Sequence, residues 1–433
     1  MHRAMVLLIT LCIMTLSIWA AELDTNSSLY WPQWRGPLGT GAAPSGNPPV
    51  EWSEQQNIRW KTRLSGTGYG TPVIWGNDIF ISAAILPDNY TPPKGGEKSS
   101  QPIKFIVLAV DRSNGKVKWE RLAREAVPHE GHQETSTWAT SSPITDGKFV
   151  YAYFGSHGLY CYTIGGDLVW EKDFGDMSIA RQFGEGSSPT LYKNRLIVNW
   201  DHEEQSFIVV LDAATGKEVW RRDRDEGTTW MTPLVVEDSG RTHVITTATN
   251  RIRSYDLATG DILWEDEGLT PNTIPSPVAA DGVVYVTSGF RGSALRAIRL
   301  SLSKGNITGT PAVLWSYNQD TPYVPSPLLH RGALYFLRSN TGTLTCIDVK
   351  TGKPFYSNQR LEGISTVYAS PVGVADRIYL IGREGTTVVI RHGADFGIIA
   401  SNTLDDNIDA SPVIVDNEIY LRGHNYLYCI SAK

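Results

Sequence analysis

Three consecutive residues, Asp201, His202 and Glu203, carry the side chains that general acid–base catalysis requires. No nucleophile motif accompanies them, and covalent catalysis would need one. Two interpretations therefore stay open for this segment, acid–base chemistry or a polar loop without chemistry. We assign no catalytic residue and keep His202 as a candidate ligand-binding residue.

A second segment holds residue types that bind metals. His129, His132 and Glu134 lie close together in the sequence, and imidazole and carboxylate groups are common metal ligands. Their spacing falls in an irregular stretch with no fixed geometry, so solvated loop histidines are the alternative interpretation. We assign no metal site.

The elements that position these residues come from an internal repeat. A small hydroxyl residue followed by proline, and then by an apolar strand, recurs eight times at intervals of mostly 41 to 50 residues, with one interval of 71. The pairs are Thr71-Pro72, Ser142-Pro143, Ser188-Pro189, Thr232-Pro233, Ser276-Pro277, Ser326-Pro327, Ser370-Pro371 and Ser411-Pro412. Proline at a strand start removes no hydrogen bond that a neighbouring strand would use.

The repeat continues with a polar turn, a second strand, a third strand that ends in an Asp-x-x-x-Gly turn, and a fourth that closes on Trp. Tyr356 takes the Trp place in the sixth copy, and the seventh copy has weakened to Ile399. The best copy runs from Asp111 through Gly115 to Trp119. The aspartate holds its own turn, the glycine accepts a positive φ, and the tryptophan buries a flat face between neighbouring sheets. The repeat predicts an all-β fold, an eight-bladed β-propeller with four-stranded blades.

The two ends of the chain are expected to share one blade. The last copy, from Pro412 to Ile430, supplies only three strands, and a matching outer strand occurs at residues 57–60, which end on Trp60. Pairing these N- and C-terminal strands would close the ring and remove an exposed edge. We therefore predict the propeller over residues 57–433, after a lead-in segment over residues 22–56.

The first residues have the layout of a secretory signal peptide. Arg3 precedes an apolar run from Ala4 to Leu16, and Ala20-Ala21 offers small residues for cleavage. We predict a signal peptide over residues 1–21, with lipid attachment at Cys12 as the alternative, and a mature protein that is periplasmic or secreted. No later segment is long and apolar enough to span a membrane as a helix.

The net charge argues against one class of partner, and the cysteine positions argue against a disulfide. A net charge of −6 argues against nucleic acid, because phosphate binding depends on Lys and Arg. Cys161, Cys346 and Cys429 occupy one column of the repeat in blades two, six and eight, too far apart for a disulfide. We expect them to be small buried core residues of a monomer.

The links between blades and the loops between second and third strands should emerge on one side of the ring, which we call the loop-rich face. Segments entering the inner strands bring aromatic and charged side chains to the axis there, and these suit a small polar or sugar-like ligand. The candidate ligand-binding residues are Tyr69, Trp138, Arg181, Glu185, Trp230, Tyr323, Tyr368 and Asp409, together with His202.

The run Ala109-x-Asp111-x-x-Asn114-Gly115-x-x-x-Trp119 resembles the tryptophan-docking motif of the PQQ-type propeller repeat family. The resemblance covers nearly the whole mature chain and implies either a quinoprotein dehydrogenase with PQQ and Ca²⁺ or a propeller lipoprotein of outer-membrane assembly. The chain lacks the adjacent cysteines typical of the dehydrogenases and the Cys-x-x-Cys-His motif of a haem domain. We therefore expect a non-enzymatic binding or scaffold protein, with the oxidoreductase and the assembly factor as alternatives.

Overall fold

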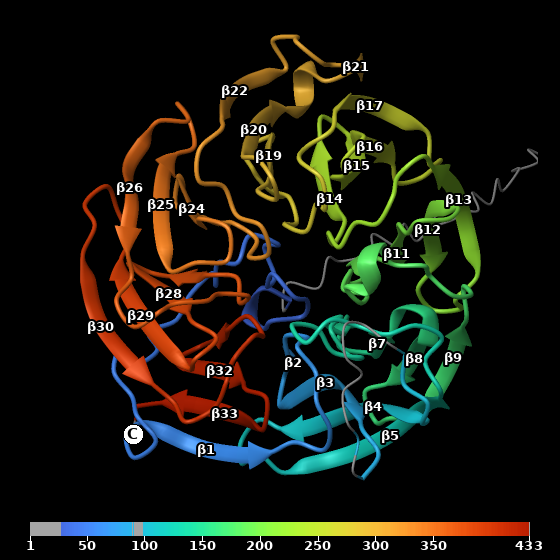
Figure 1. Ribbon diagram of the computed structural model, residues 1–433, viewed down its shortest axis with the longest axis vertical. Coiled ribbons are helices and arrows are strands. Elements are labelled where there is room, and N and C mark those ends of the chain that lie inside the picture. The colour runs from blue at the N-terminus through green and yellow to red at the C-terminus, as the bar shows by residue number, and fades with distance from the viewer. Residues whose placement is uncertain (1–26, 89, 91–97, 433) are drawn as a thin grey trace, which may run out of the picture.

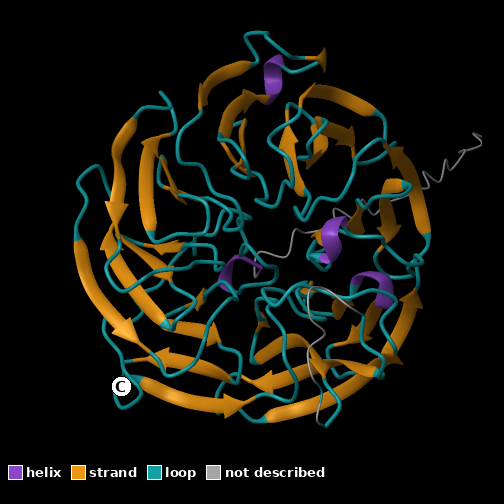
Figure 2. Ribbon diagram, viewed as in Figure 1, coloured by secondary structure: helices purple, strands orange, loops and turns teal. Residues whose placement is uncertain are grey.

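The structure, a computed structural model, describes residues 27–88, 90 and 98–432. Its strands form eight sheets around a central axis (Figure 1), so the predicted all-β, eight-bladed propeller is confirmed. Helical turns in the described part are short, as Figure 2 shows. They are η1 (Ser27–Leu29), η3 (Gly155–His157), η4 (Ala180–Gln182) and η5 (Leu300–Leu302). The predicted signal peptide lies outside the described residues.

Blades 1 to 4 follow one another along the chain, and each begins with its innermost strand. Blade 1 holds β2 (Val73–Trp75), β3 (Asp78–Ile85), β4 (Ile103–Asp111) and β5 (Val117–Ala126). Blade 2 holds β6 (Ile144–Thr145), β7 (Phe149–Tyr153), β8 (Leu159–Thr163) and β9 (Leu168–Lys172). Blade 3 holds β10 (Thr190–Tyr192), β11 (Arg195–Trp200), β12 (Ser206–Asp212) and β13 (Glu218–Arg224). Blade 4 holds β14 (Leu234–Asp238), β15 (Arg241–Thr246), β16 (Arg251–Asp256) and β17 (Ile262–Glu267).

Blades 5 to 8 complete the ring. Blade 5 holds β18 (Val278–Ala280), β19 (Val283–Ser288), β20 (Ala294–Arg299) and β22 (Val313–Tyr317). Blade 6 holds β23 (Leu328–His330), β24 (Ala333–Leu337), β25 (Thr343–Asp348) and β26 (Pro354–Arg360). Blade 7 holds β27 (Val372–Val374), β28 (Arg377–Ile381), β29 (Thr386–Arg391) and β30 (Ile398–Thr403). Blade 8 holds β31 (Val413–Val415), β32 (Glu418–Arg422), β33 (Tyr426–Ser431) and β1 (Ile58–Arg63).

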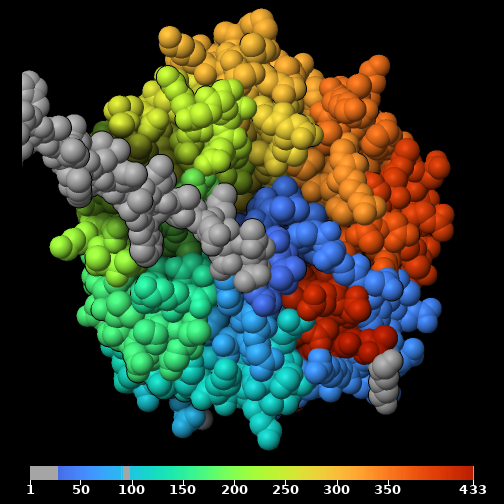
Figure 3. Space-filling view, turned by 180° about the vertical axis from the view of Figure 1, so that it is seen from behind, coloured from blue at the N-terminus to red at the C-terminus, as the bar shows by residue number. Residues whose placement is uncertain are grey.

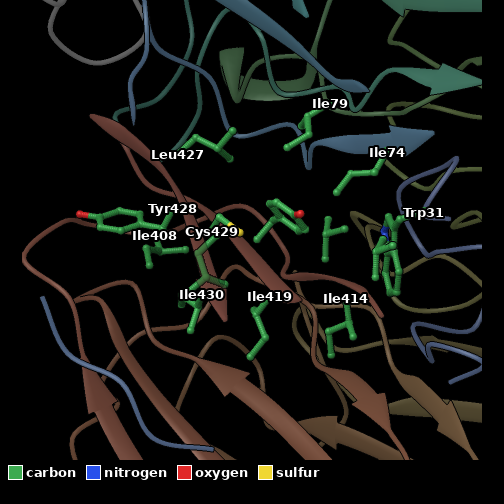
Figure 4. Packing of buried hydrophobic residues seen from close by; sticks show 14 of the residues in the cluster. Trp31, Ile74, Ile79, Ile408, Ile414, Ile419, Leu427, Tyr428, Cys429 and Ile430 are labelled. Carbon is green, nitrogen blue, oxygen red and sulfur yellow. The ribbon is translucent and has the colours of Figure 1, made fainter. Parts of the chain in front are cut away.

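Blade 8 joins the two ends of the chain, as predicted. Strand β1 pairs antiparallel with β33, with Trp60 opposite Cys429, and the two strands lie side by side in Figure 1. Behind them, Ile419 and Ile430 pack with residues of blade 1 such as Ile79 in one buried cluster (Figure 4). Blade 8 therefore shares a hydrophobic core with blade 1.

In blades 8, 1, 2, 3 and 5 the repeated tryptophan docks the blade onto the next one. The indole N–H of Trp119 donates to the Ile164 carbonyl at 3.0 Å, and that of Trp170 donates to the Ala213 carbonyl at 3.0 Å. The ring of Trp170 also covers Gly216, where an added Cβ would lie 2.8 Å from ring carbons. The glycine of each turn is thus needed for close approach as well as for its positive φ.

Blade 5 departs from the repeat. A detour after β20 places the short strand β21 (Gly305–Asn306) in parallel beside β17 of blade 4, which makes that sheet five-stranded. The detour replaces the Asp-x-x-x-Gly turn on which the blade 4 tryptophan would dock. In consequence the buried indole N–H of Trp264 has no hydrogen-bond acceptor.

A closed circle of hydrogen bonds joins the innermost strands. The residue before each repeated proline gives its backbone N–H to the hydroxyl of the equivalent residue in the next blade, at 2.8–3.1 Å. The order is Thr71, Ser142, Ser188, Thr232, Ser276, Ser326, Ser370, Ser411 and back to Thr71. This hydroxyl ring explains why the repeat requires Ser or Thr at that position, since the N–H is buried and needs an acceptor.

The described part of the lead-in segment, residues 27–56, covers the face opposite the loop-rich one (Figure 3). Trp31 forms a bridge with Ile74 of blade 1, and Arg35 reaches across to donate to the Pro327 and Pro371 carbonyls of blades 6 and 7. Figure 3 shows this segment in blue at the centre of the molecule, seen from behind. Burial without a carboxylate partner lowers the pKa of Arg35 to about 9. The described lead-in residues therefore lie across the axis on this side.

The three cysteines of the described chain are buried and form no disulfide, which agrees with their prediction as core residues. In each of them burial raises the thiol pKa to about 12. The described residues contain no helix that is long and apolar enough to cross a membrane.

Candidate functional site

A cavity of about 430 Å³ opens on the axis at the loop-rich face, and every blade contributes to its wall. The links that enter the inner strands supply one residue or more from each blade in turn. In order around the ring these include Tyr69, Ser136, Glu185, Trp230, Ile274, Tyr323, Tyr368 and Asp409. The volume falls in the range of small-molecule sites.

The lead-in segment forms the floor of this axial cavity. Trp34 lies in the wall and its indole N–H donates to the Ser411 hydroxyl at 3.3 Å. Ser411 belongs to the hydroxyl ring, so Trp34 is held directly beneath the inner strands. Trp34 thus stands between the axial cavity and a second hollow of about 880 Å³ on the lead-in side.

Six of the predicted site residues line the axial cavity, namely Tyr69, Glu185, Trp230, Tyr323, Tyr368 and Asp409. Three others do not. Trp138 lines a small neighbouring pocket, Arg181 is exposed on η4, and His202 is buried in blade 3. The structure therefore brings six of the nine predicted residues together around the axis, and it places the other three outside the axial cavity.

The histidine segment packs beside the cavity. His132 meets Trp138 edge to face, and His129 Nε2 donates to the Met177 carbonyl at 2.7 Å. Burial lowers the pKa of His132 and lowers that of His157 to about 3, so both rings are neutral near pH 7. Among the described residues no group of three His, Cys, Asp or Glu side chains could hold a metal ion.

The segment Asp201-His202-Glu203 of blade 3 makes structural contacts within the protein. Asp201 forms a buried two-pronged salt bridge with Arg224, at 2.7 and 3.0 Å. His202 accepts at Nδ1 from the Ser178 backbone N–H and donates from Nε2 to the Gln205 carbonyl, both at 3.1 Å. Side chains with every polar atom engaged in this way hold loops together, and they do not reach the axial cavity.

Glu185 lies where the axial cavity meets two smaller pockets. Its carboxylate accepts from the Ser156 backbone N–H at 2.8 Å and from the Ser156 hydroxyl at 2.5 Å. Burial outweighs these hydrogen bonds and raises the pKa of Glu185 to about 7. This carboxyl therefore changes charge near neutral pH.

Asp409 lies on the blade 8 side of the cavity and is 6% exposed. Its Oδ2 accepts from His424 Nε2 at 2.9 Å and pairs with Arg383 Nη2 at 3.2 Å. The other oxygen, Oδ1, is buried and accepts no hydrogen bond. His424 also stacks on the ring of Tyr69, with centroids 4.9 Å apart, and burial raises the pKa of Tyr69 to about 12.

Sequence reasoning missed several residues of this wall. Trp34 lies in the lead-in segment, where no repeat points to the axis, and Phe183 lies in a link of irregular length. Phe290 stacks on Tyr323 with centroids 4.9 Å apart. Aromatic residues in the links of other blades were the available signal for Phe183. Phe290 lies in the loop between β19 and β20, a type of loop that the sequence places on the loop-rich face, whereas nothing local distinguishes Trp34.

Comparison with known proteins gives matches in sequence and in fold. A family model described as outer membrane protein assembly factor BamB matches residues 50–198 and 162–322. BamB of Kangiella koreensis is 27% identical over 188 residues, which covers 40% of this chain and 46% of that protein. The match thus spans less than half of the relative's length.

Two solved structures illustrate the likeness in fold. BamB from Moraxella catarrhalis is 16% identical with a TM-score of 0.53, covering 86% of this chain and 98% of that one. A europium-containing methanol dehydrogenase is 10% identical with a TM-score of 0.62, covering 92% of this chain and 90% of that one. At these identities the similarity concerns the propeller alone.

Proposed function

Because the chain belongs to the PQQ-like propeller family, matched by the model described as outer membrane protein assembly factor BamB, we propose that it is a non-enzymatic binding protein of the cell envelope. The axial cavity of the loop-rich face is its ligand site. One observation carries this proposal: all eight blades and the lead-in segment converge on one cavity of about 430 Å³. A concave site with an aromatic wall and a few polar groups suits a small polar ligand.

The described lining of the cavity offers no acid and base side by side. Its two carboxyl groups, Glu185 and Asp409, come from blades 3 and 8, and no histidine belongs to the described lining. The histidines nearest Glu185 have depressed pKa values or hydrogen bonds to backbone carbonyls. Binding without chemistry is the function that this lining supports best.

A thermal-shift screen of small neutral, cationic and anionic polar compounds tests the proposal. At least one compound should raise the melting temperature of the wild type by a few degrees, because ligands that bind only the folded state stabilise it. The double variant Phe290→Ala, Tyr368→Ala should lose this shift. A shift that persists in the double variant would place the ligand elsewhere, and the absence of any shift would contradict the proposal.

The wall fits a quinone cofactor poorly. PQQ carries three carboxylates and is held with a divalent cation, whereas the described lining of the axial cavity contains two carboxyl side chains and no Lys or Arg. The described residues offer no metal-binding cluster, and the buried cysteines lie in three separate blades. Quinone-dependent oxidation is therefore the weaker candidate.

A role in outer-membrane protein assembly is the second candidate, because the family model and the Kangiella koreensis relative both carry that description. In this role the chain would bind other proteins through the rim of the loop-rich face. Affinity purification of the tagged chain from its own cell envelope tests it. Recovery of an outer-membrane assembly component supports this role, and failure to recover one under mild cross-linking counts against it.

A further inference from the structure

The wall of the axial cavity combines aromatic rings with acidic groups. Its rings are Tyr69, Phe183, Trp230, Phe290, Tyr323 and Tyr368, above the floor formed by Trp34. Its ionisable acids are Glu185 and Asp409, and the described lining holds no Lys or Arg. Ring faces and carboxylates both attract positive charge.

The rings are held in place by contacts within the protein. The indole N–H of Trp230 donates to the Gly184 carbonyl at 2.7 Å, and Phe183 meets Trp230 edge to face at 6.0 Å. Across the ring, Phe290 and Tyr323 stack at 4.9 Å. Rings fixed in this way lose little conformational freedom when a ligand binds.

Asp409 adds a carboxylate oxygen without a hydrogen-bond donor to the wall. Its Oδ1 is buried without any donor, although the residue is 94% buried and Oδ2 already pairs with Arg383 and His424. A buried carboxylate oxygen without a partner is costly, and a positively charged ligand would offset part of that cost. Arg383 itself stacks over Tyr368, 5.1 Å from the ring centroid, so a cation already occupies part of this aromatic surface.

We propose that the ligand of the axial cavity is an organic ammonium ion, carried on a small molecule. Its cationic group lies among the aromatic rings, with Asp409 and Glu185 as counter-charges. The inference rests on the proposed function of the cavity as a ligand site, and it adds the charge class of the ligand. Methylated ammonium groups suit the wall best, because they offer apolar surface to the rings as well as charge.

Isothermal titration with choline and with its neutral isostere 3,3-dimethylbutan-1-ol tests the inference on the unmodified protein. The two probes have nearly the same shape, so their difference isolates the charge. Choline should bind at least about tenfold more tightly than the alcohol. Equal affinities, or no binding of choline, would overturn the inference.

Variants locate the binding. Asp409→Asn and Tyr368→Ala should each weaken choline binding about tenfold or more, while Asp405→Asn, an exposed carboxyl of the same link, should leave it unchanged. Because Asp409→Asn could disturb folding, Trp230→Phe provides a second readout: choline should alter the tryptophan fluorescence of the wild type more than that of this variant. Unchanged affinity in Tyr368→Ala would also overturn the inference.

The two proposals fail in different ways. If neutral compounds shift the wild-type melting temperature, and not that of the Phe290→Ala, Tyr368→Ala variant, the cavity is a ligand site of another class. The ammonium inference is then wrong while the proposed function stands. If no compound of any charge acts through the cavity, both are wrong.

Discussion

The environment of the cavity shifts the pKa of Glu185. This residue faces groups from several links, and burial dominates over the two hydrogen bonds from Ser156, so its pKa rises from 4.5 to about 7. The titratable groups around it are His129, Glu130, His132, Tyr153, His157 and Asp201. A carboxyl that is half-ionised near pH 7 makes the charge of the cavity depend on pH.

The raised pKa also has a consequence for stability. Between pH 4.5 and about 7 the folded chain keeps a proton on Glu185 that the unfolded chain releases. The contribution of this group to the free energy of unfolding is therefore fully present below pH 4.5 and is lost as the pH rises to about 7. Urea unfolding of Glu185→Gln should show a smaller decline over this interval than the wild type. The exposed Glu204→Gln is the control and should follow the wild type, and an unchanged decline in Glu185→Gln would contradict the raised pKa.

At the scale of the strands, the propeller is held by contacts between equivalent positions of neighbouring blades. The hydroxyl ring joins the inner strands, and the tryptophan docks join the outer ones to the following turn. Each contact satisfies a buried N–H group and so avoids the cost of leaving it unpaired. The hydroxyl ring therefore stabilises every blade interface near the axis, and tryptophan docks add a second contact at the outer edge of blades 8, 1, 2, 3 and 5.

Ser326→Ala tests the hydroxyl ring. Ser326 is buried, and its hydroxyl accepts the Ser276 backbone N–H at 2.9 Å. Removing the hydroxyl leaves that N–H without an acceptor, which should lower the free energy of unfolding by about 1–3 kcal/mol. Ser326→Thr keeps the hydroxyl, as Thr71 and Thr232 do in blades 1 and 4, and should cost much less. Equal losses for both variants in urea unfolding would show that the hydroxyl is not the stabilising feature.

Gly216→Ala and Gly240→Ala separate backbone strain from docking. Both glycines have positive φ, +69° and +80°, but an added Cβ would lie 2.8 Å from the Trp170 ring at Gly216 and meets no atom within 4 Å at Gly240. Alanine at either position should cost about 1–2 kcal/mol from the left-handed backbone. Gly216→Ala should cost at least about 1 kcal/mol more, because the ring must move. Equal free energies of unfolding for the two variants would argue against a tight dock.

The repeat made the blades predictable because each residue type acts locally: proline begins a strand, aspartate and glycine form a turn, and tryptophan covers its neighbour. Contacts between segments that lie far apart in the sequence were not predictable. The hydroxyl ring depends on how adjacent copies meet, and Trp34 reaches the axis from a lead-in segment without a repeat. Tyr69, Trp230, Tyr323 and Tyr368 were recognised because aromatic residues recur in the links that enter the inner strands. His202, by contrast, belongs to a loop that blade 3 uses for its own hydrogen bonds.

For the molecule as a whole, joining the ends matters more than any single contact. An open array of repeats can lose structure from its terminal unit, since that unit has one neighbour only. Here β1 pairs with β33 and Trp60 docks on the Arg112 carbonyl of blade 1 at 2.9 Å. Every blade, the closing one included, therefore has two neighbours, and the axial cavity depends on all of them.

Hydrogen exchange tests the closure. If the ring is closed in solution, backbone amides of β1, which pair with β33 in the register Lys61 to Tyr428 and Thr62 to Leu427, should exchange as slowly as those of β28 in the interior of blade 7. The reason is that opening the terminal strand requires breaking both its ladder and the tryptophan dock. Trp60→Ala removes the dock alone and should speed exchange in β1 while β28 keeps its protection. Fast exchange of β1 in the wild type would show that the closing strand opens independently.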